Sequence, residues 1–446
     1  MNKFVNLFGS FNNCMYKTIA NLQIRESKID VKDVFKMMIA SSFNNNYYSN
    51  FTERFELDTA SPGNLSYWRV KIYDCDFSDL YKLCYDYYKT NKENIFNDLP
   101  INYPIVNNNN AVNRRHYDIK INNLKHIFER YNVKVADGTV INCAIKNTNG
   151  KNVSSIIINS IYDIDTNLFS DYEMAYDTNE RKALLRQELT KEDLIIIDRG
   201  YSSPEFLQKL DKTTNFVVRM KSNYVILKKF IKDHYNTMVT QIGDMKVKII
   251  KYHIDKSTKN IILNKYIDDN NEDDEDKDSV YILMTNVVSL TRDDCMNLYD
   301  LRWSIEPSFK KMKTNFKLRH ICKESNINDP VKKTNFWINM SFLMYNMTAI
   351  LKNELDRQFV GNCRFSKCAA FIREFIVQSN KTMTDKIIKK LIAIGKRFQN
   401  NTKNNKNLNS DRPKKRGRYE AINTIQNRNE GILDENELEM NEIIVK

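Results

Sequence analysis

The chain is poor in glycine and proline and has no long apolar run, and each absence excludes a class of protein. Of its 446 residues only 10 are glycine and 7 are proline, which excludes collagen-like and proline-rich low-complexity chains. We find no run of about 18 apolar residues, so we expect no transmembrane helix. The first residues lack the basic, apolar and small-residue segments of a secretion signal. We therefore expect an intracellular protein.

The cysteines and histidines show no spacing typical of a structural zinc site. No two of the 8 cysteines form a Cys-x-x-Cys pair, and the 5 histidines have no companion at ligand spacing. We expect the cysteines to be reduced and mostly buried as small apolar side chains.

The net charge of +13 favours a polyanionic partner, either nucleic acid or an anionic membrane surface. Charge alone does not choose between these two. Hydrophobic residues make up 41% of the chain and charged residues 28%, which are ordinary values for globular proteins. At this length we expect more than one domain.

Changes in residue pattern divide the chain into five segments. We predict a mainly helical region, a mixed α/β segment, a β-rich insertion, a second mainly helical segment and a flexible basic tail, over residues 1–130, 131–221, 222–288, 289–400 and 401–446. In the first segment, turn-forming residues 61–66 separate two helical stretches and precede the basic aromatic run Tyr67–Lys71. A helix-turn-helix is one interpretation of this pattern.

The second segment predicts a mixed α/β sheet with flanking helices. Short β-rich runs alternate with helical stretches, and the predicted strands cover Val133–Asp137, Val153–Tyr162, 168–174, Asp193–Asp198 and Asn215–Lys221. The run before Asp198 is almost wholly apolar, as expected of a central strand covered on both faces.

Asp137 and Asp198 each end a predicted strand. If those strands are neighbours, the two carboxylates would repel each other unless a cation lies between them. Hard oxygen ligands of this kind suit Mg²⁺ or Mn²⁺. The alternative for Asp137 is an ordinary turn, because Asp-Gly is a common turn dipeptide.

A second set of polar residues has helical spacing. Positions i, i+3, i+7 and i+14 would form one stripe on a helix, and they are occupied by Tyr299, Arg302, Glu306 and Lys313. A metal-binding carboxylate between cations and a phenol suits attack on a phosphodiester. The alternative is a surface helix in which Arg302 and Glu306 form an ordinary ion pair. Pro307 would kink an unbroken helix here.

These residues together resemble insertion-sequence-4-type DDE transposases. The stripe matches the Tyr-Arg-Glu-Lys signature of that family without a gap. Residues Val135–Thr139 and Asp198–Ser203 are similar to its two aspartate motifs, and Asn215–Lys221 resembles a strand whose arginine contacts DNA. A long β-rich insertion before the glutamate helix is another trait of the family.

The resemblance implies an RNase H-like catalytic core that depends on divalent ions. Two Mg²⁺ ions, with Mn²⁺ as a substitute, would be held by the catalytic residues Asp137, Asp198 and Glu306. The DNA end would be bound by Arg219, Tyr299, Arg302 and Lys313.

The implied function is cut-and-paste DNA transposition, by hydrolysis and transesterification of phosphodiesters. The implied partners are double-stranded DNA, as terminal inverted repeats and as target, and a second copy of the chain in the DNA complex, with no membrane. The protein would work at the nucleoid in a bacterial cytoplasm, or in the nucleus of a eukaryotic or viral host. The alternative is a domesticated or inactive relative that binds DNA without cutting it.

Overall fold

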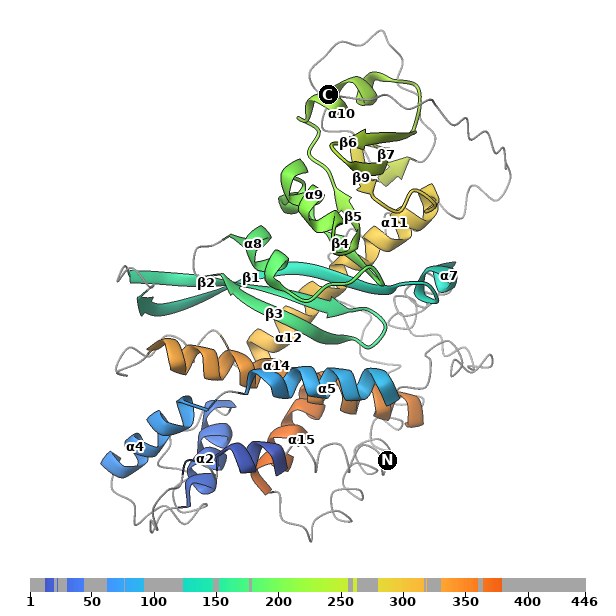
Figure 1. Cartoon of the computed structure of the whole chain (residues 1–446). Coiled ribbons are helices and arrows are strands. Elements are labelled where there is room, and N and C mark those ends of the chain that lie inside the picture. The colour runs from blue at the N-terminus through green and yellow to red at the C-terminus, as the bar shows by residue number, and fades with distance from the viewer. Residues whose placement is uncertain are drawn as a thin grey trace, which may run out of the picture. The chain divides into compact units, whose positions relative to one another are not determined.

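A computed structural model of the chain (Figure 1) describes a folded core and leaves several segments out. The described residues are 13–19, 22, 30–43, 62–75, 77–91, 123–146, 152–175, 179–255, 260–262, 280–316, 318, 330–359 and 364–378. The predicted tail at 401–446 lies outside them. Among the described helices, none has both the length and the apolar character that a membrane span requires.

The described strands join into one sheet. They are β1 (Asn132–Lys146), β2 (Asn152–Asp163), β3 (Leu168–Ala175), β4 (Asp193–Ile197), β5 (Asn215–Arg219), β6 (Thr237–Ile242), β7 (Met245–Asp255), β8 (Asn260–Ile262) and β9 (Val280–Thr285). Their order is β3-β2-β1-β4-β5-β9-β7-β6, and β8 pairs with β7.

The first five strands confirm the predicted RNase H-like mixed sheet. They follow the order 3-2-1-4-5, in which β2 and β3 are antiparallel whereas β1, β4 and β5 are parallel neighbours. All five residues of β4 are buried, as its apolar sequence predicted for a central strand.

The β-rich insertion extends this same sheet, because β9 pairs antiparallel with both β5 and β7. Two elements of the insertion were not predicted from the sequence, namely β6 and the helix α10 (Val225–Lys232). Helix α10 has only eight residues and begins with β-branched Val225 and Ile226, so its helical period was too short to recognise.

Contacts divide the chain into two compact units. Unit 1 comprises residues 1–93, 138–183 and 305–410, and unit 2 comprises 94–137, 184–304 and 411–446. The boundary crosses β1 between Asp137 and Gly138, and it also crosses the helix α8 (Glu180–Arg186).

Unit 1 packs helices against the β2–β3 hairpin. Its helices are α2 (Val31–Phe43), α4 (Pro62–Tyr73), α5 (Ser78–Asn91), α12 (Ile305–Asn315), α14 (Pro330–Phe359) and α15 (Phe365–Gln378). Both α5 and α14 contact β3 and lie side by side in Figure 1. The ring of Phe169 on β3 lies within 4.8–5.6 Å, between centroids, of Phe309, Phe342 and Tyr345.

The turn predicted at 61–66 is wrong. Residues 62–66 form the first turns of α4, which starts at Pro62. Proline is well suited to a first helical turn, because the backbone N–H groups there lack helical partners and its fixed φ is compatible with a helix. The same Ser-Pro-Gly-Asn residues therefore begin a helix here.

Three asparagines of α14, spaced seven residues apart, bind the chain at and before β3. Asn346 is fully buried, accepts from the Phe169 N–H at 3.0 Å and donates to the Phe169 carbonyl at 2.9 Å. The Tyr172 hydroxyl donates to Asn339, and Asn353 donates to the Thr166 carbonyl at 2.9 Å. Polar groups that the hairpin would otherwise leave unbonded in the interior are satisfied in this way.

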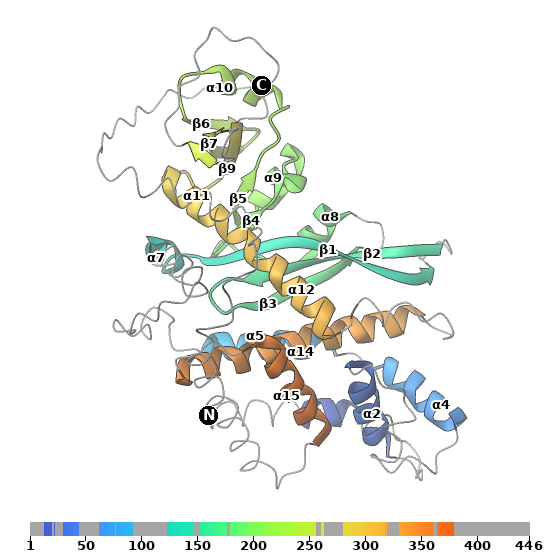
Figure 2. The same ribbon diagram turned by 180° about the vertical axis from the view of Figure 1, so that it is seen from behind.

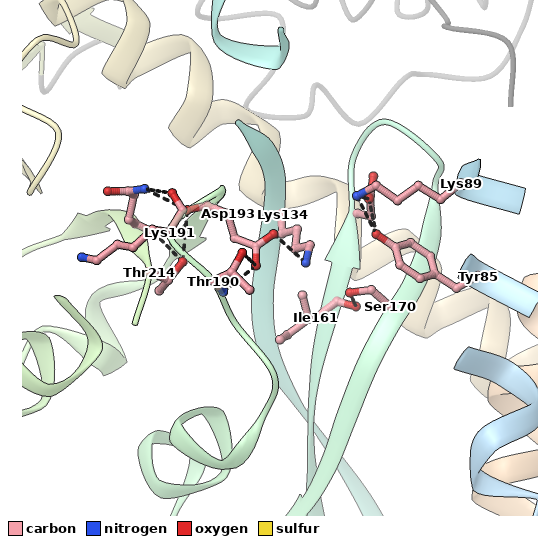
Figure 3. Close-up of polar contacts among 11 residues, drawn as sticks. Tyr85, Lys89, Lys134, Ile161, Ser170, Thr190, Lys191, Asp193 and Thr214 are labelled. Atoms are coloured by element: carbon pink, nitrogen blue, oxygen red, sulfur yellow. Dashed lines mark hydrogen bonds and ion pairs between the residues drawn. The ribbon is translucent and has the colours of Figure 1, made fainter. Parts of the chain in front are cut away.

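A buried carboxylate joins β2 to α5. Asp163 is 1% exposed, and it accepts hydrogen bonds from the Tyr85 hydroxyl at 2.6 Å, from the Lys89 ammonium at 3.1 Å and from the Thr166 N–H at 3.0 Å. Figure 3 shows the polar ends of Tyr85 and Lys89 close together, where the two are also hydrogen-bonded to each other at 3.0 Å. Burial alone would raise the pKa of Asp163, but Lys89 and the hydrogen bonds outweigh burial and lower it.

Unit 2 contains β4 to β9, the first part of β1 and short helices. These helices are α7 (Lys125–Phe128), η2 (Arg199–Tyr201), α9 (Pro204–Asp211), α10, α11 (Arg292–Asp300) and η4 (Leu301–Ser304). Helix α11 begins with a capping box, because the Thr291 side chain accepts from the Asp294 N–H and the Asp294 carboxylate accepts from the Thr291 N–H.

Replacing Asn346 by leucine should lower the free energy of unfolding by about 3 kcal/mol, because it removes the partner of two buried backbone groups. Asn353→Leu is the matched control, since it removes one half-buried bond and should cost about 1 kcal/mol. Urea denaturation followed by circular dichroism measures both. Equal midpoints for the two variants would contradict the bridging role of Asn346.

The Asp163 cluster predicts a pH-dependent stability. Because its folded pKa is lowered, the stabilisation is fully present above the unfolded value of about 3.9 and is lost as the pH falls through the folded pKa. The melting temperature of Asp163→Asn should therefore be lower than that of the wild type at pH 7. The difference between the two melting temperatures should become smaller in acid below about pH 4. Asp86→Asn, which changes an exposed acid of α5, should melt like the wild type at every pH. A difference in melting temperature between Asp163→Asn and the wild type that stays constant down to acid pH would refute this account.

Candidate active site

Asp137 lies within β1, which continues to Lys146, so the predicted strand end and the alternative Asp-Gly turn are both wrong, whereas Asp198 directly follows β4 as predicted. The parallel register of β1 and β4 runs from Asn132 opposite Asp193 to Val135 opposite Ile196. Continued by two residues, this register sets Asp137 opposite Asp198, whose own backbone is still extended at φ −83° and ψ 179°. Side chains at opposed positions of parallel strands point to the same face. Both carboxylates are half-buried.

A buried ion pair lies between the same two strands. The Lys134 ammonium is 2.7 Å from the Asp193 carboxylate, and the two residues are 8% and 2% exposed. Asp193 also accepts from the Thr190 N–H at 2.9 Å, and its carbonyl accepts from the Thr214 hydroxyl at 3.1 Å (Figure 3). A buried pair of this kind resists slippage, because a shifted register would leave two charges unpaired in the interior.

A glycine shapes the turn after β4. The Gly200 N–H donates to the Asp198 carboxylate at 2.7 Å, which caps the short helix η2. A Cβ at position 200 would stand 2.9 Å from the same carboxylate oxygen. Any larger residue there would have to push the Asp198 side chain out of its present position.

The stretch from Tyr299 to Lys313 is not one helix. Helix α11 ends at Asp300, η4 follows, and α12 starts at Ile305. The expected single stripe along one helix, kinked at Pro307, is therefore wrong. The helix breaks six residues earlier, so that Pro307 becomes the third residue of α12, where a missing N–H costs no helical hydrogen bond.

The break directs Arg302 toward the first acid. The Arg302 guanidinium is 3.6 Å from the Asp137 carboxylate, and the two side chains are 8% and 20% exposed. The same guanidinium lies over the Trp303 ring at 4.1 Å. Arg302 is therefore held by a charge on one side and by an aromatic face next to it in the chain.

Tyr299 and Arg219 meet at a tyrosine that sequence reasoning missed. The Arg219 guanidinium lies 4.4 Å from the centre of the Tyr281 ring, and the rings of Tyr281 and Tyr299 are 5.6 Å apart at 75°. Figure 2 shows the helix α11, which carries Tyr299, next to β9, which carries Tyr281. The alternation along β9 could have suggested which face Tyr281 occupies, but not that β9 pairs with β5.

Tyr299 stays protonated in this environment. Burial raises its pKa, and the nearby Asp198 carboxylate adds to the increase. Arg302, Arg219 and a hydrogen bond with Tyr281 act in the opposite direction without reversing the shift. Tyr299 therefore presents a phenol that can donate a hydrogen bond.

A basic cavity of about 180 Å³ opens beside Arg219. Its wall includes Arg199, Lys221, Ser222 and Asn223, and strand β9 contributes Val280 and Ile282. Three cationic side chains around one hollow make a positive local field that attracts anions.

Glu306 and Lys313 belong to the helix α12 in unit 1. Glu306 is exposed in the first turn of that helix and Lys313 is half-buried in its last turn. Within the part of the chain that the structure describes, no three acidic, histidine or cysteine side chains form a ready metal-binding group. Asp137 and Asp198 both belong to unit 2, whereas Glu306 belongs to unit 1.

The described cysteines and histidines take no part in these arrangements. Cys75, Cys84, Cys295 and Cys368 are buried and Cys14 is exposed, and none of these five described cysteines is in a disulfide. Burial raises the pKa of Cys75 to about 11 and that of Cys295 to about 12, so neither is a reactive thiolate at neutral pH.

Comparisons with known proteins place the chain. No curated protein matches it significantly. It is similar to the piggyBac transposase in a cryo-EM structure of a synaptic complex with hairpin DNA, at 9% identity and a TM-score of 0.41, over 84% of this chain and 80% of that one. Residues 129–347 match the model of the family described as the transposase DDE domain. Through these residues, the chain belongs to the DDE transposase family.

Proposed function

We propose that the protein is a magnesium-dependent DNA transposase of the insertion-sequence-4 type, which cuts transposon ends and joins them to target DNA. One observation supports this most strongly. In a chain with a transposase DDE domain, Asp137 and Asp198 each lie two residues beyond Val135 and Ile196, which are paired between β1 and β4, and this supports a pair of acids that acts together. The proposed partners are double-stranded DNA with terminal inverted repeats, target DNA, and a second copy of the chain.

The acids fit divalent ions by their chemistry. Two neighbouring half-buried carboxylates repel each other, and a divalent cation between them would relieve the repulsion while accepting their hard oxygens. Glu306 is proposed as the third ligand, on the strength of its place in the family signature. Bound ions would supply activation of water or of a 3′ hydroxyl and stabilisation of the leaving oxygen.

The cationic and phenolic side chains are proposed to bind the DNA end. Arg302 and Arg219 offer guanidinium groups that suit phosphate oxygens. Tyr299, which stays protonated, can donate to a phosphate oxygen near Asp198. Lys313 is proposed to add a further contact from α12. We also propose that the N-terminal region, where α4 presents exposed Tyr67 and Lys71, contributes to DNA binding.

Asp198→Asn and Glu306→Gln test the proposed chemistry. The asparagine side chain in the first variant keeps an acceptor for the Gly200 N–H but loses the charge that a metal ligand needs. Nicking of a duplex with the terminal inverted repeat, in Mg²⁺ or Mn²⁺, should fall by about 1000-fold or more, or roughly 4 kcal/mol of barrier, in each variant. Binding of the same duplex should persist.

The matched control is Asp211→Asn, which changes a half-buried acid in α9 and should nick like the wild type. If Asp198→Asn or Glu306→Gln nicks normally, the acid that it replaces takes no part in the reaction. Wild-type protein that binds the repeat but never nicks it would instead support a relative that has kept DNA binding and lost cleavage.

Arg302 should compete with metal for Asp137 in the absence of DNA. Removing a cation 3.6 Å from a ligand carboxylate should strengthen Mn²⁺ binding by Arg302→Met about fivefold, or about 1 kcal/mol in a solvent-like dielectric. Isothermal titration with MnCl₂ measures the affinity. Lys229→Met removes an exposed cation of α10 and should leave the affinity unchanged. An unchanged affinity in Arg302→Met would count against metal binding at Asp137.

A further inference from the structure

Tyr281 occupies a position fixed by the pairing of β5 with β9. Arg219 is directly opposite Leu283 in this antiparallel pair, so Tyr281, two residues before Leu283, is its diagonal neighbour on the same face. This geometry sets the Arg219 guanidinium 4.4 Å from the centre of the Tyr281 ring. Such a contact is attractive because the electron-rich face of the ring binds a cation.

The other side of Tyr281 meets α11. Its ring approaches the Tyr299 ring edge-on at 5.6 Å, and its hydroxyl forms a hydrogen bond with that of Tyr299. This hydrogen bond links Tyr281 on β9 to Tyr299 on α11. Tyr281 is therefore in contact with two residues that are 80 positions apart in the chain.

We propose that Tyr281 is a positioning residue that holds Arg219 and Tyr299 in the arrangement in which they bind a DNA phosphate. This inference rests on the proposed function, because it assumes that Arg219 and Tyr299 contact DNA. Tyr281 acts through those two side chains, because its ring restrains the guanidinium and its hydroxyl is hydrogen-bonded to the Tyr299 hydroxyl.

The physical gain is preorganisation. A free arginine side chain has many rotamers, and binding DNA would have to restrict them. Stacking on Tyr281 restricts Arg219 before DNA arrives. The hydrogen bond with Tyr281 likewise orients the Tyr299 hydroxyl, and hydrogen bonds in a chain strengthen one another.

The same row of rings offers a matched control. Tyr252 is directly opposite Tyr281 on β7, and their centroids are 6.4 Å apart. Its hydroxyl donates to the Arg292 carbonyl at 2.6 Å, at the start of α11. Tyr252→Phe therefore removes a hydroxyl from the same row of rings. This hydroxyl also contacts α11, but at Arg292 and not at Tyr299.

The test is a double-mutant cycle in the full chain. Binding of a fluorescein-labelled duplex with the terminal inverted repeat is measured by anisotropy for Tyr281→Phe, Tyr299→Phe and the double variant. Tyr299→Phe should weaken binding about tenfold, as expected for a lost hydrogen bond to a charged group. Tyr281→Phe should weaken it about threefold, and the double variant should bind like Tyr299→Phe alone.

Tyr281→Leu should weaken binding about fivefold more than Tyr281→Phe, because it also removes the ring beneath Arg219. In an Arg219→Met background this extra loss should disappear. Tyr252→Phe should bind DNA like the wild type, although its thermal midpoint falls through loss of the Arg292 bond. A Tyr281→Phe effect on binding without a matching fall in midpoint separates positioning from simple packing.

These measurements distinguish a failure of the proposed DNA contacts from a failure of the positioning role of Tyr281. If Tyr299→Phe and Arg219→Met bind like the wild type, their proposed DNA contacts are wrong. If those two weaken binding but both Tyr281 variants bind normally, the positioning role is wrong. Independent, additive effects of Tyr281→Phe and Tyr299→Phe would also overturn it.

Discussion

Asp137 and Asp198 each lie two residues beyond Val135 and Ile196, the last pair in the parallel register of β1 and β4, and like charges at neighbouring positions repel each other. The buried residues that precede the acids hold the two strands in this register. Lys134 and Asp193 pair in the interior, and β4 is apolar and buried along its whole length. A slip by one residue would separate the buried ion pair and turn the apolar side chains to the opposite face. The repulsion between the acids is thus maintained by the surrounding sheet.

The side chains around the acids come from elements that are distant in sequence. Arg302 reaches Asp137 from η4, Arg219 comes from β5, and Tyr281 comes from the insertion. The insertion is therefore part of the wall of the site, because β9 pairs directly with β5. Loss or rearrangement of β9 would leave Arg219 without its aromatic support and α11 without one of its contacts. Variation within the insertion can thus influence the site without changing a single acid.

Strand periodicity was enough to predict the core, because apolar runs come directly before Asp137 in β1 and before Asp198 at the end of β4. It could not predict the break before Glu306, since the local pattern from Tyr299 to Lys313 is compatible with one continuous helix. The prediction of a turn at residues 62–66 failed for a similar reason, because proline and glycine suit a turn and a first helical turn equally well. Tyr281 was missed because its neighbour Arg219 is 62 positions away. Such a pair depends on which strands become neighbours, and local sequence does not encode that.

The asparagines of α14 show how a helix and a strand can share one repeat. Seven helical residues advance about 10.5 Å, and three strand residues advance about 10 Å. Because the two spacings match, Asn339 reaches Tyr172 and Asn346 reaches Phe169. Asn353 continues the series and reaches Thr166. A single-residue insertion in either element would rotate or shift the remaining contacts out of reach together. This part of the fold should therefore accept substitutions far more readily than changes in length, and related chains should vary in length elsewhere.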